Sequence, residues 1–135
     1  MFLDASVILA LLMQEPESEA IYESLSRQHR LKTSPLAIFE ASSRLVRLGA
    51  KFEEAFDTVS GYLSKFAVVV IPLDFQEGKV AHACASRYHH LTGHPARLNM
   101  GDCFAYAAAR TSGLKLAYKG NDFIHTDIDG VRFGP

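Results

Sequence analysis

Residues 99–123 read NMGDCFAYAAARTSGLKLAYKGNDF, and this run predicts a helix that is followed directly by a strand. Its alanine-rich first half predicts a helix from Met100 to Ser112, and the glycine that follows is a typical helix end. Leu114 to Tyr118 then predicts a short strand. An acid stands at each junction of these elements, Asp102 at the start of the helix and Asp122 just after the strand.

The rest of the chain repeats this alternation of helices and strands. Helices are expected over residues 7–13, 16–30, 35–49, 51–65 and from 74 to about 92, and strands over 2–3, 68–71 and 131–133. The β-branched residues of 68–71 predict a strand that is buried on both faces. The alternation predicts an α/β fold in one domain over residues 1–135, a three-layer sandwich whose central, mainly parallel sheet of four to five short strands has helices on both faces.

The composition favours a single globular domain over a non-specific nucleic-acid binder or a membrane protein. The chain has 135 residues, 48% of them hydrophobic, which is enough for one core. Its net charge of −1 gives no basic footprint of the kind that non-specific nucleic-acid binders carry. No basic segment precedes the first apolar residues, and no apolar run is long enough to span a bilayer. We therefore expect a cytoplasmic protein with no membrane partner.

Three aspartates stand at ends or starts of predicted elements. Asp4 follows the first strand, Asp122 follows the strand at 114–118, and Asp102 opens a helix. Ligands of open parallel sheets bind at the carboxyl ends of the strands, so Asp4 and Asp122 are expected at that edge. Each aspartate also has an ordinary reading as a helix cap or a turn residue. Convergent carboxylates repel one another, and hard divalent cations such as Mg²⁺ prefer oxygen ligands, so together they indicate a metal site.

Glu40 is the one carboxylate of the helix at 35–49. It shares a stripe of that helix with Ser43, Arg44 and Arg47, and the remaining circumference is largely apolar. Its ordinary role would be an exposed ion pair with Arg44, four residues on, worth about 0.3–0.5 kcal/mol. A carboxylate on a helix that is mostly buried is a better candidate for a site.

Four segments carry a resemblance to a known family. They are Leu3-Asp4-Ala5-Ser6, residues 35–40, residues 94–107, and residues 119–123 with Thr126-Asp127-Ile128. In these segments the chain resembles the PIN-domain ribonucleases, and within them the VapC toxins of VapBC type II toxin–antitoxin modules. The resemblance runs nearly end to end, and the two later blocks are its most specific parts.

The resemblance implies an acidic metal-binding and catalytic quartet. It falls on Asp4, Glu40, Asp102 and Asp122. It further implies that the enzyme is a Mg²⁺-dependent ribonuclease, with Mn²⁺ possible, that cleaves tRNA or other structured RNA. The substrate-binding candidates are Ser6, Arg97, Asn99, Lys119 and Asn121, and Asp127 is a reserve ligand at most. A homodimer and a cognate VapB-like antitoxin are the implied protein partners.

Two other functions remain open from the sequence. A phosphohydrolase could use Asp4 as its nucleophile, although such enzymes usually have a second acid two residues on, where this chain has Ser6. A domain that keeps the fold but only binds its partners, without turnover, is the other alternative. Metal-dependent cleavage of RNA distinguishes the nuclease from both.

Overall fold

Five short parallel strands form the central sheet of the computed structural model, which describes all of residues 1–135. They are β1 (Phe2–Leu3), β2 (Lys32–Thr33), β3 (Val69–Val70), β4 (Leu116–Tyr118) and β5 (Gly130–Arg132). Their order across the sheet is β3-β2-β1-β4-β5. β1 and β4, at opposite ends of the sequence, therefore pair at the centre, with Phe2 opposite Leu116. The expected parallel sheet is confirmed, at the upper end of the predicted number of strands.

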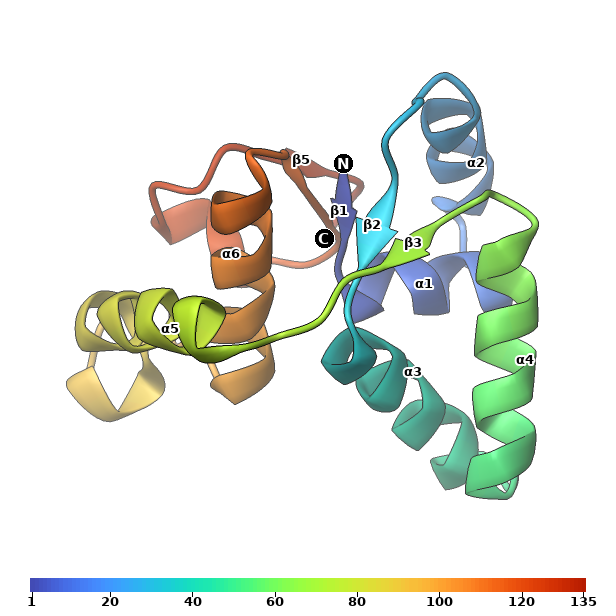
Figure 1. Ribbon diagram of the computed structural model, residues 1–135, viewed down its shortest axis with the longest axis horizontal. Helices are drawn as coiled ribbons and strands as arrows, with labels where there is room; N and C mark the ends of the chain where they lie inside the picture. Colours follow the sequence, from blue (N-terminus) through green and yellow to red (C-terminus); the bar gives the residue numbers. More distant parts are fainter.

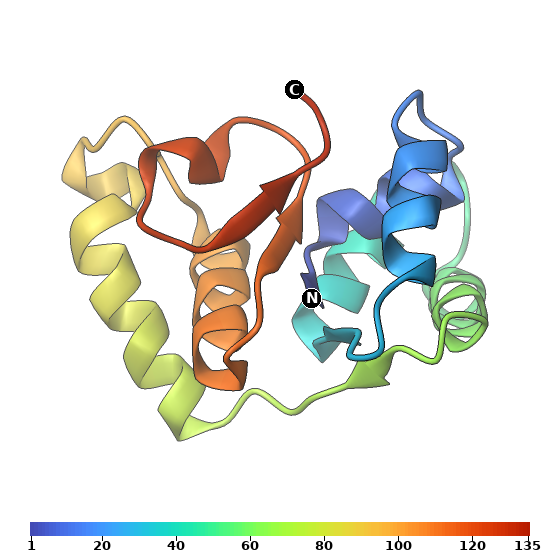
Figure 2. The same cartoon turned by 90° about the horizontal axis from the view of Figure 1, so that it is seen from above.

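Six α-helices cover the two faces of this sheet. They are α1 (Ala5–Leu12), α2 (Ser18–Ser26), α3 (Pro35–Arg47), α4 (Phe52–Ser64), α5 (Phe75–Tyr88) and α6 (Met100–Ser112). Figure 1 shows α5 and α6 on one side of the strands and α1 to α4 on the other, and Figure 2 shows the same division from above. The molecule is the expected three-layer α/β sandwich.

The alternation of side chains along the strands divides the core in two. Leu3 and Ala117 face the core built from α1 to α4. Phe2, Leu116 and Tyr118 face the core built from α5 and α6. Because successive side chains of a strand point to opposite faces, two adjacent residues of β1 are enough to anchor both helical layers.

Most of the helix starts are those that the sequence predicts. Ser34 caps α3 by accepting a hydrogen bond from the Ala37 N–H at 3.1 Å, with proline at the first helical position. Asp74 caps α5, and its side chain accepts from the Gln76 N–H at 3.0 Å. Gly113 ends α6 with a φ of +65°, the left-handed conformation that glycine adopts without strain.

Some elements differ from their sequence predictions. The strand at 68–71 is shorter, and Val69 and Val70 are 56% and 47% exposed rather than buried, because β3 lies at the edge of the sheet. β2 was not predicted, since it has only two residues and no apolar run; it pairs with β1 and β3, and the Thr33 hydroxyl donates to the Leu3 carbonyl at 2.9 Å. The helix predicted over 16–30 spans only 18–26, and α5 gives way after Tyr88 to the short 3₁₀ helix η1 (His90–Thr92).

The carboxyl ends of the strands lie at one edge because all five strands run in the same direction. Asp4 directly follows β1 and opens α1, and α3 starts after β2. β4 leads through a short turn to the 3₁₀ helix η2 (Asp122–His125). The topology thus delivers residues that are far apart in sequence to this edge. None of the helices combines the length and the apolarity that crossing a bilayer would need.

Candidate active site

A groove of about 540 Å³ at this edge contains all four predicted acids. Asp4 comes from the β1–α1 junction, Glu40 from the second turn of α3, Asp102 from the first turn of α6 and Asp122 from the start of η2. Because the four belong to different elements, no local motif could bring them together, and only the sheet topology does. The sequence prediction that these acids converge holds in the structure.

Asp4 is fixed by its neighbours rather than free to move. It is 7% exposed, and its Oδ2 accepts hydrogen bonds from the backbone N–H of Ser6 at 3.1 Å and from the Ser6 hydroxyl. The Ser6 Oγ in turn accepts from the backbone N–H of Lys119 at 3.0 Å, just after β4. Ser6 therefore ties the Asp4 carboxylate to the end of the neighbouring strand, and its hydroxyl is occupied by protein groups.

Asp102 combines helix capping with a place in the groove. Its Oδ2 accepts from the Asn99 N–H at 2.9 Å, and the Asn99 Oδ1 accepts from the Asp102 N–H at 2.9 Å. This reciprocal pair is a capping box that satisfies two N–H groups at the start of α6. The second oxygen of Asp102 makes no hydrogen bond within the protein. Capping fixes the carboxylate and leaves one oxygen for a ligand.

Glu40 lies against the first turn of α6. A Cβ atom placed on Gly101 would collide with both carboxylate oxygens of Glu40. Glycine at position 101 therefore leaves room for the Glu40 carboxylate where it stands, and a larger residue would displace it, although the φ of Gly101 is not positive. The sequence prediction did not include Gly101; a glycine inside the first turn of an otherwise alanine-rich helix was its only signal.

The acids shift one another's titration. Burial, and after it the charges of Asp4 and Asp102, raises the pKa of Glu40 to about 7. Burial also raises the pKa of Asp102 to about 7, helped by the charges of Asp4 and Asp122 and opposed by the hydrogen bond from Asn99. The pKa of Asp4 is raised as well, chiefly by burial. Such mutual shifts mean that the cluster holds its full negative charge at a cost in free energy unless a cation is present.

The donor chemistry fits a hard divalent cation. Glu40 and Asp122 accept no hydrogen bond from the protein, and Asp4 and Asp102 each keep one oxygen without one. As the side chains stand, no three His, Cys, Asp or Glu side chains are close enough to form a ready metal-binding group. The set is nonetheless all oxygen, and each of the four carboxylates keeps at least one oxygen without a hydrogen bond from the protein, which suits Mg²⁺ or Mn²⁺.

The other predicted substrate residues do not share one environment. Asn99 and Lys119 line the groove. The Lys119 ammonium, however, is held by ion pairs with Glu15 and with Glu17, the latter at 3.0 Å. Arg97 is exposed, outside the residues that line the groove, and has a φ of +49°. The Asn121 side chain also lies outside the lining and accepts a hydrogen bond from Arg132.

Asp127, the reserve ligand of the sequence analysis, lies in a different cluster. The Tyr106 hydroxyl donates to its Oδ1 at 2.8 Å, and Arg87 and Arg110 pair with its Oδ2 at 3.1 and 3.2 Å. The hydrogen bond from Tyr106, followed by that from Arg87, lowers the pKa of Asp127 to about 2. Asp127 therefore joins the C-terminal segment to α5 and α6 and does not belong to the groove.

Residues that the sequence prediction did not assign to the site also line the groove. Arg44 and Arg47 follow Glu40 along α3 and face the same hollow, with Phe39 and Met100 at its rim. The Glu40–Arg44 ion pair considered above is absent from the structure: neither arginine forms an ion pair within 4.0 Å or a side-chain hydrogen bond. The sequence showed that Arg44 and Arg47 share a helical stripe with Glu40. It did not show that the two arginines have no acidic partner.

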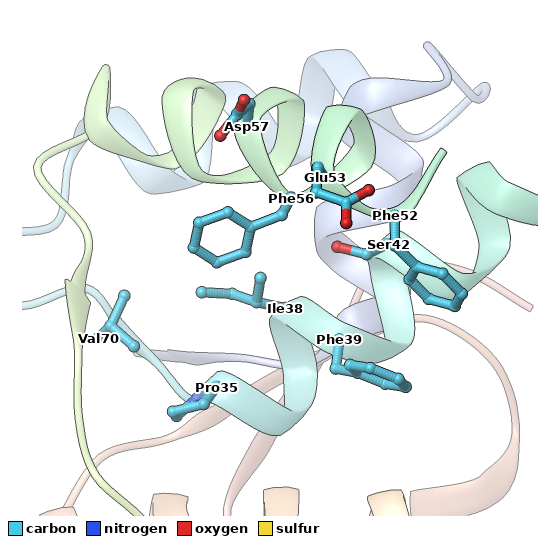
Figure 3. A pocket seen from close by; sticks show the side chains of 9 residues that line it. All are labelled: Pro35, Ile38, Phe39, Ser42, Phe52, Glu53, Phe56, Asp57 and Val70. Atoms are coloured by element: carbon cyan, nitrogen blue, oxygen red, sulfur yellow. The ribbon is translucent and has the colours of Figure 1, made fainter. Parts of the chain in front are cut away.

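A second hollow lies on the other side of α3 and has a different character. It has a volume of about 710 Å³, and most of its lining is apolar, from α3, α4 and β3, with Phe52 and Phe56 on α4 about half exposed (Figure 3). Phe39 stacks on Phe52 with ring centroids 5.6 Å apart and so stands between the two hollows. Glu53 and Asp57 are the only charged residues of its lining.

The comparisons with known proteins agree with this geometry. The PIN domain family matches residues 1–129. A VapC ribonuclease of Rhizobium meliloti is 41% identical, over 94% of this chain and 98% of that protein, and ribonuclease VapC42 of Mycobacterium tuberculosis is 32% identical, over 95% and 96%. Among solved structures, Mycobacterium tuberculosis VapC20, described as a Sarcin-Ricin loop cleaving toxin, superposes with a TM-score of 0.74 at 18% identity, over 97% of this chain and 98% of that one. A toxin–antitoxin complex from Klebsiella pneumoniae gives a TM-score of 0.65 at 18% identity, over 91% and 89%.

Proposed function

The chain belongs to the PIN domain family, and on that premise we propose that it is a metal-dependent endoribonuclease acting as the toxin of a toxin–antitoxin module. The relatives that match over nearly their full length are VapC ribonucleases, which supports this activity. The observation that carries the proposal is the groove itself. Four carboxylates from four separate elements line it. Burial, together with the charges of neighbouring acids, raises the pKa of three of them, Asp4, Glu40 and Asp102, an arrangement that costs stability unless it serves a cation.

Different residues of the groove have different proposed roles in hydrolysis. Asp4, Glu40 and Asp102 would hold the metal, with Asp122 completing the set directly or through water. A bound Mg²⁺ or Mn²⁺ supplies activation of water and stabilisation of the phosphate oxygens that gain charge during in-line displacement. We assign to Asp122 the removal of a proton from a water at the groove, and its exposure, the highest of the four, supports this role. Ser6 and Asn99 hold Asp4 and Asp102 in position through the hydrogen bonds described above.

The partners follow from the same proposal. RNA is the substrate class, with tRNA or another structured RNA as the specific candidate. A VapB-like antitoxin is the protein partner, consistent with the toxin–antitoxin complex among the structural neighbours. We further propose a homodimer, a cytoplasmic location and a single PIN domain over residues 1–135.

The experiment is metal-dependent cleavage. Purified, folded and antitoxin-free protein is incubated with total RNA and with tRNA, in Mg²⁺ or Mn²⁺ and then in EDTA. Asp4→Asn and Asp102→Asn are run beside the wild type, since each keeps the shape of the side chain and removes its charge. We expect discrete RNA fragments only with wild-type protein and metal. Identical RNA patterns in every lane would refute the nuclease and favour a binding domain without turnover.

A phosphohydrolase is less compatible with the site. The Asp4 carboxylate is buried, and one of its oxygens accepts two hydrogen bonds from Ser6, which suits a fixed ligand better than an attacking group. Hydrolysis of small phosphate monoesters in the same assay, with RNA left intact, would support this alternative.

A further inference from the structure

The unpaired cations of the groove lie on only one of its walls. Three basic residues line it, and one of them, Lys119, is already neutralised by Glu15 and Glu17. The other two, Arg44 and Arg47, are exposed, and no acid of the protein pairs with them. Two of the arginines elsewhere, Arg87 and Arg110, are by contrast held by Asp127. The positive charge available to a ligand in the groove therefore comes from α3 alone.

Helix geometry relates these arginines to the acids. Arg44 and Arg47 follow Glu40 by four and seven residues, which places them about 6 and 10 Å further along the axis of α3. At about 100° per residue, both lie within roughly 40° of the Glu40 direction around the helix. The wall of the groove thus changes from negative to positive along one helical stripe, with the carboxylates at one end and two unpaired guanidinium groups beyond them.

We propose that Arg44 and Arg47 bind the phosphates of the RNA strand next to the scissile bond, so that the strand runs along α3 away from the acid cluster. This inference rests on the proposed ribonuclease function. A guanidinium group suits the task because it presents several N–H donors to phosphate oxygens and keeps its charge at any working pH. The proposal assigns phosphate contact to α3, whereas the sequence analysis offered Arg97, Asn99 and Lys119 among its substrate-binding candidates. The two arginines would bind the substrate, and the chemical step is left to the four acids.

The test combines turnover with binding. Arg44→Gln, Arg47→Gln and the double variant are compared with Arg27→Gln, a matched control. Arg27 also stands at the end of a helix, α2, and its only partner is Glu23 at 4.0 Å. Binding of a fluorescein-labelled oligouridylate is followed by anisotropy at several KCl concentrations with Mg²⁺ present, in the Asp102→Asn background so that the probe stays intact. Steady-state cleavage is measured without that background.

The two arginines should act through substrate binding. Each substitution is expected to weaken oligouridylate binding about three- to tenfold at low salt and to reduce the salt slope by roughly 0.7. KM for RNA should rise while kcat changes little, the Mn²⁺ concentration that gives half-maximal activity should not increase, and Arg→Lys variants should recover much of the binding. The Arg27→Gln variant should match its parent in all of these.

The outcomes separate this inference from the proposed function. Wild-type cleavage together with unchanged KM and salt slope in the double variant would overturn the phosphate role and leave the nuclease intact. A wild type that never cleaves RNA but binds the oligouridylate with an arginine-dependent salt slope would refute the nuclease and keep the role. A fall in kcat with unchanged KM, together with a lowered unfolding temperature, would show that the arginines serve only the C-terminal end of α3, which also overturns it.

Discussion

The two sides of α3 line hollows of opposite character. On one side, Glu40 faces three other carboxylates in a polar groove. On the other, Ile38 and Phe39 line a hollow that is mostly apolar. Covering the apolar hollow is favourable because water is released from its surface. Closing the acidic groove is unfavourable, because it brings negative charges together.

This difference between the two hollows suggests which residues contribute to function and which do not. The acids are held in the groove by local contacts: a glycine leaves room for Glu40, and hydrogen bonds from Ser6 and Asn99 fix Asp4 and Asp102. Residues that matter for the groove should therefore change activity far more than folding. Residues of the apolar hollow should have little effect on the rate of RNA cleavage. Four predictions test this contrast.

The largest effect is expected from Gly101→Ala. The added methyl group would collide with the Glu40 carboxylate and displace it from the groove. Misplacement of a catalytic group by about 1 Å can cost on the order of 100-fold in rate, so we expect RNA cleavage to fall by about that factor. The unfolding temperature should stay the same or rise, because alanine is the better helix former by up to about 1 kcal/mol. Cleavage assays and thermal unfolding of the same preparation measure both, and unchanged cleavage would show that the contact does not fix Glu40.

The next effect concerns pH in the absence of metal. In the folded protein the pKa values of Glu40 and Asp102 are about 7, whereas carboxyl groups of an unfolded chain titrate near 4. Between these values the folded state binds more protons, so the free energy of unfolding falls as pH rises through this window. We expect a higher unfolding temperature at about pH 5.5 than at about pH 8 in EDTA, and a flatter profile when Mg²⁺ or Mn²⁺ is added. A metal-free profile that rises toward pH 8 would contradict the repulsion.

A smaller effect separates the two roles of Asp102. Asp102→Asn removes a charge but keeps an oxygen for the Asn99 N–H, so the metal-free protein should be as stable as the wild type or more stable. Asp102→Ala also loses that hydrogen bond and should be less stable than the Asn variant by about 1 kcal/mol. Urea unfolding in EDTA measures the difference, and both variants should lose the stabilisation that metal gives the wild type. A large loss of stability in Asp102→Asn would show that capping is the main role of this residue.

The smallest effect on activity is expected in the apolar hollow. Phe56 is 55% exposed there and belongs to no part of the acidic groove. Phe56→Ser should leave the rate of RNA cleavage by the isolated protein within about twofold and change stability by less than about 1 kcal/mol, as for other exposed positions. Binding of a hydrophobic dye should decrease, because exposed aromatic surface is removed. A strong loss of cleavage would mean that the two sides of α3 are coupled.

The four predicted acids line one groove, because the parallel sheet delivers their elements to the same edge. The start of α3 at Ser34 and the end of α6 at Gly113 were predicted correctly, because each depends on residues close by in the chain. Lys119, a substrate-binding candidate, and Asp127, a reserve ligand, instead form ion pairs within the protein, which the sequence does not show. Their partners come from elsewhere in the chain, Glu15 and Glu17 for the first and Arg87 and Arg110 for the second.

The edge strands show the same limit. The β-branched run at Val69 and Val70 was correctly recognised as strand, yet its exposure depends on its place at the end of the sheet order, which local composition does not encode. β2 was missed because only two residues pair there, through partners on β1 and β3. Strand propensity describes how a segment fits a pleated surface, and its burial depends on the neighbours that it finds.

The sequence alone was enough to nominate the acids of the groove and to locate several helix ends, because caps and turns depend on a few neighbouring residues. The approach of Glu40 to the first turn of α6 at Gly101, and the location on α3 of the cations that are free for a ligand, depend on the tertiary structure. The two kinds of feature differ in the range of the interactions behind them. Hydrogen bonds at helix ends form between near neighbours, whereas repulsion among carboxylates and the pairing of lysine or arginine with acids depend on distances that only the parallel sheet sets.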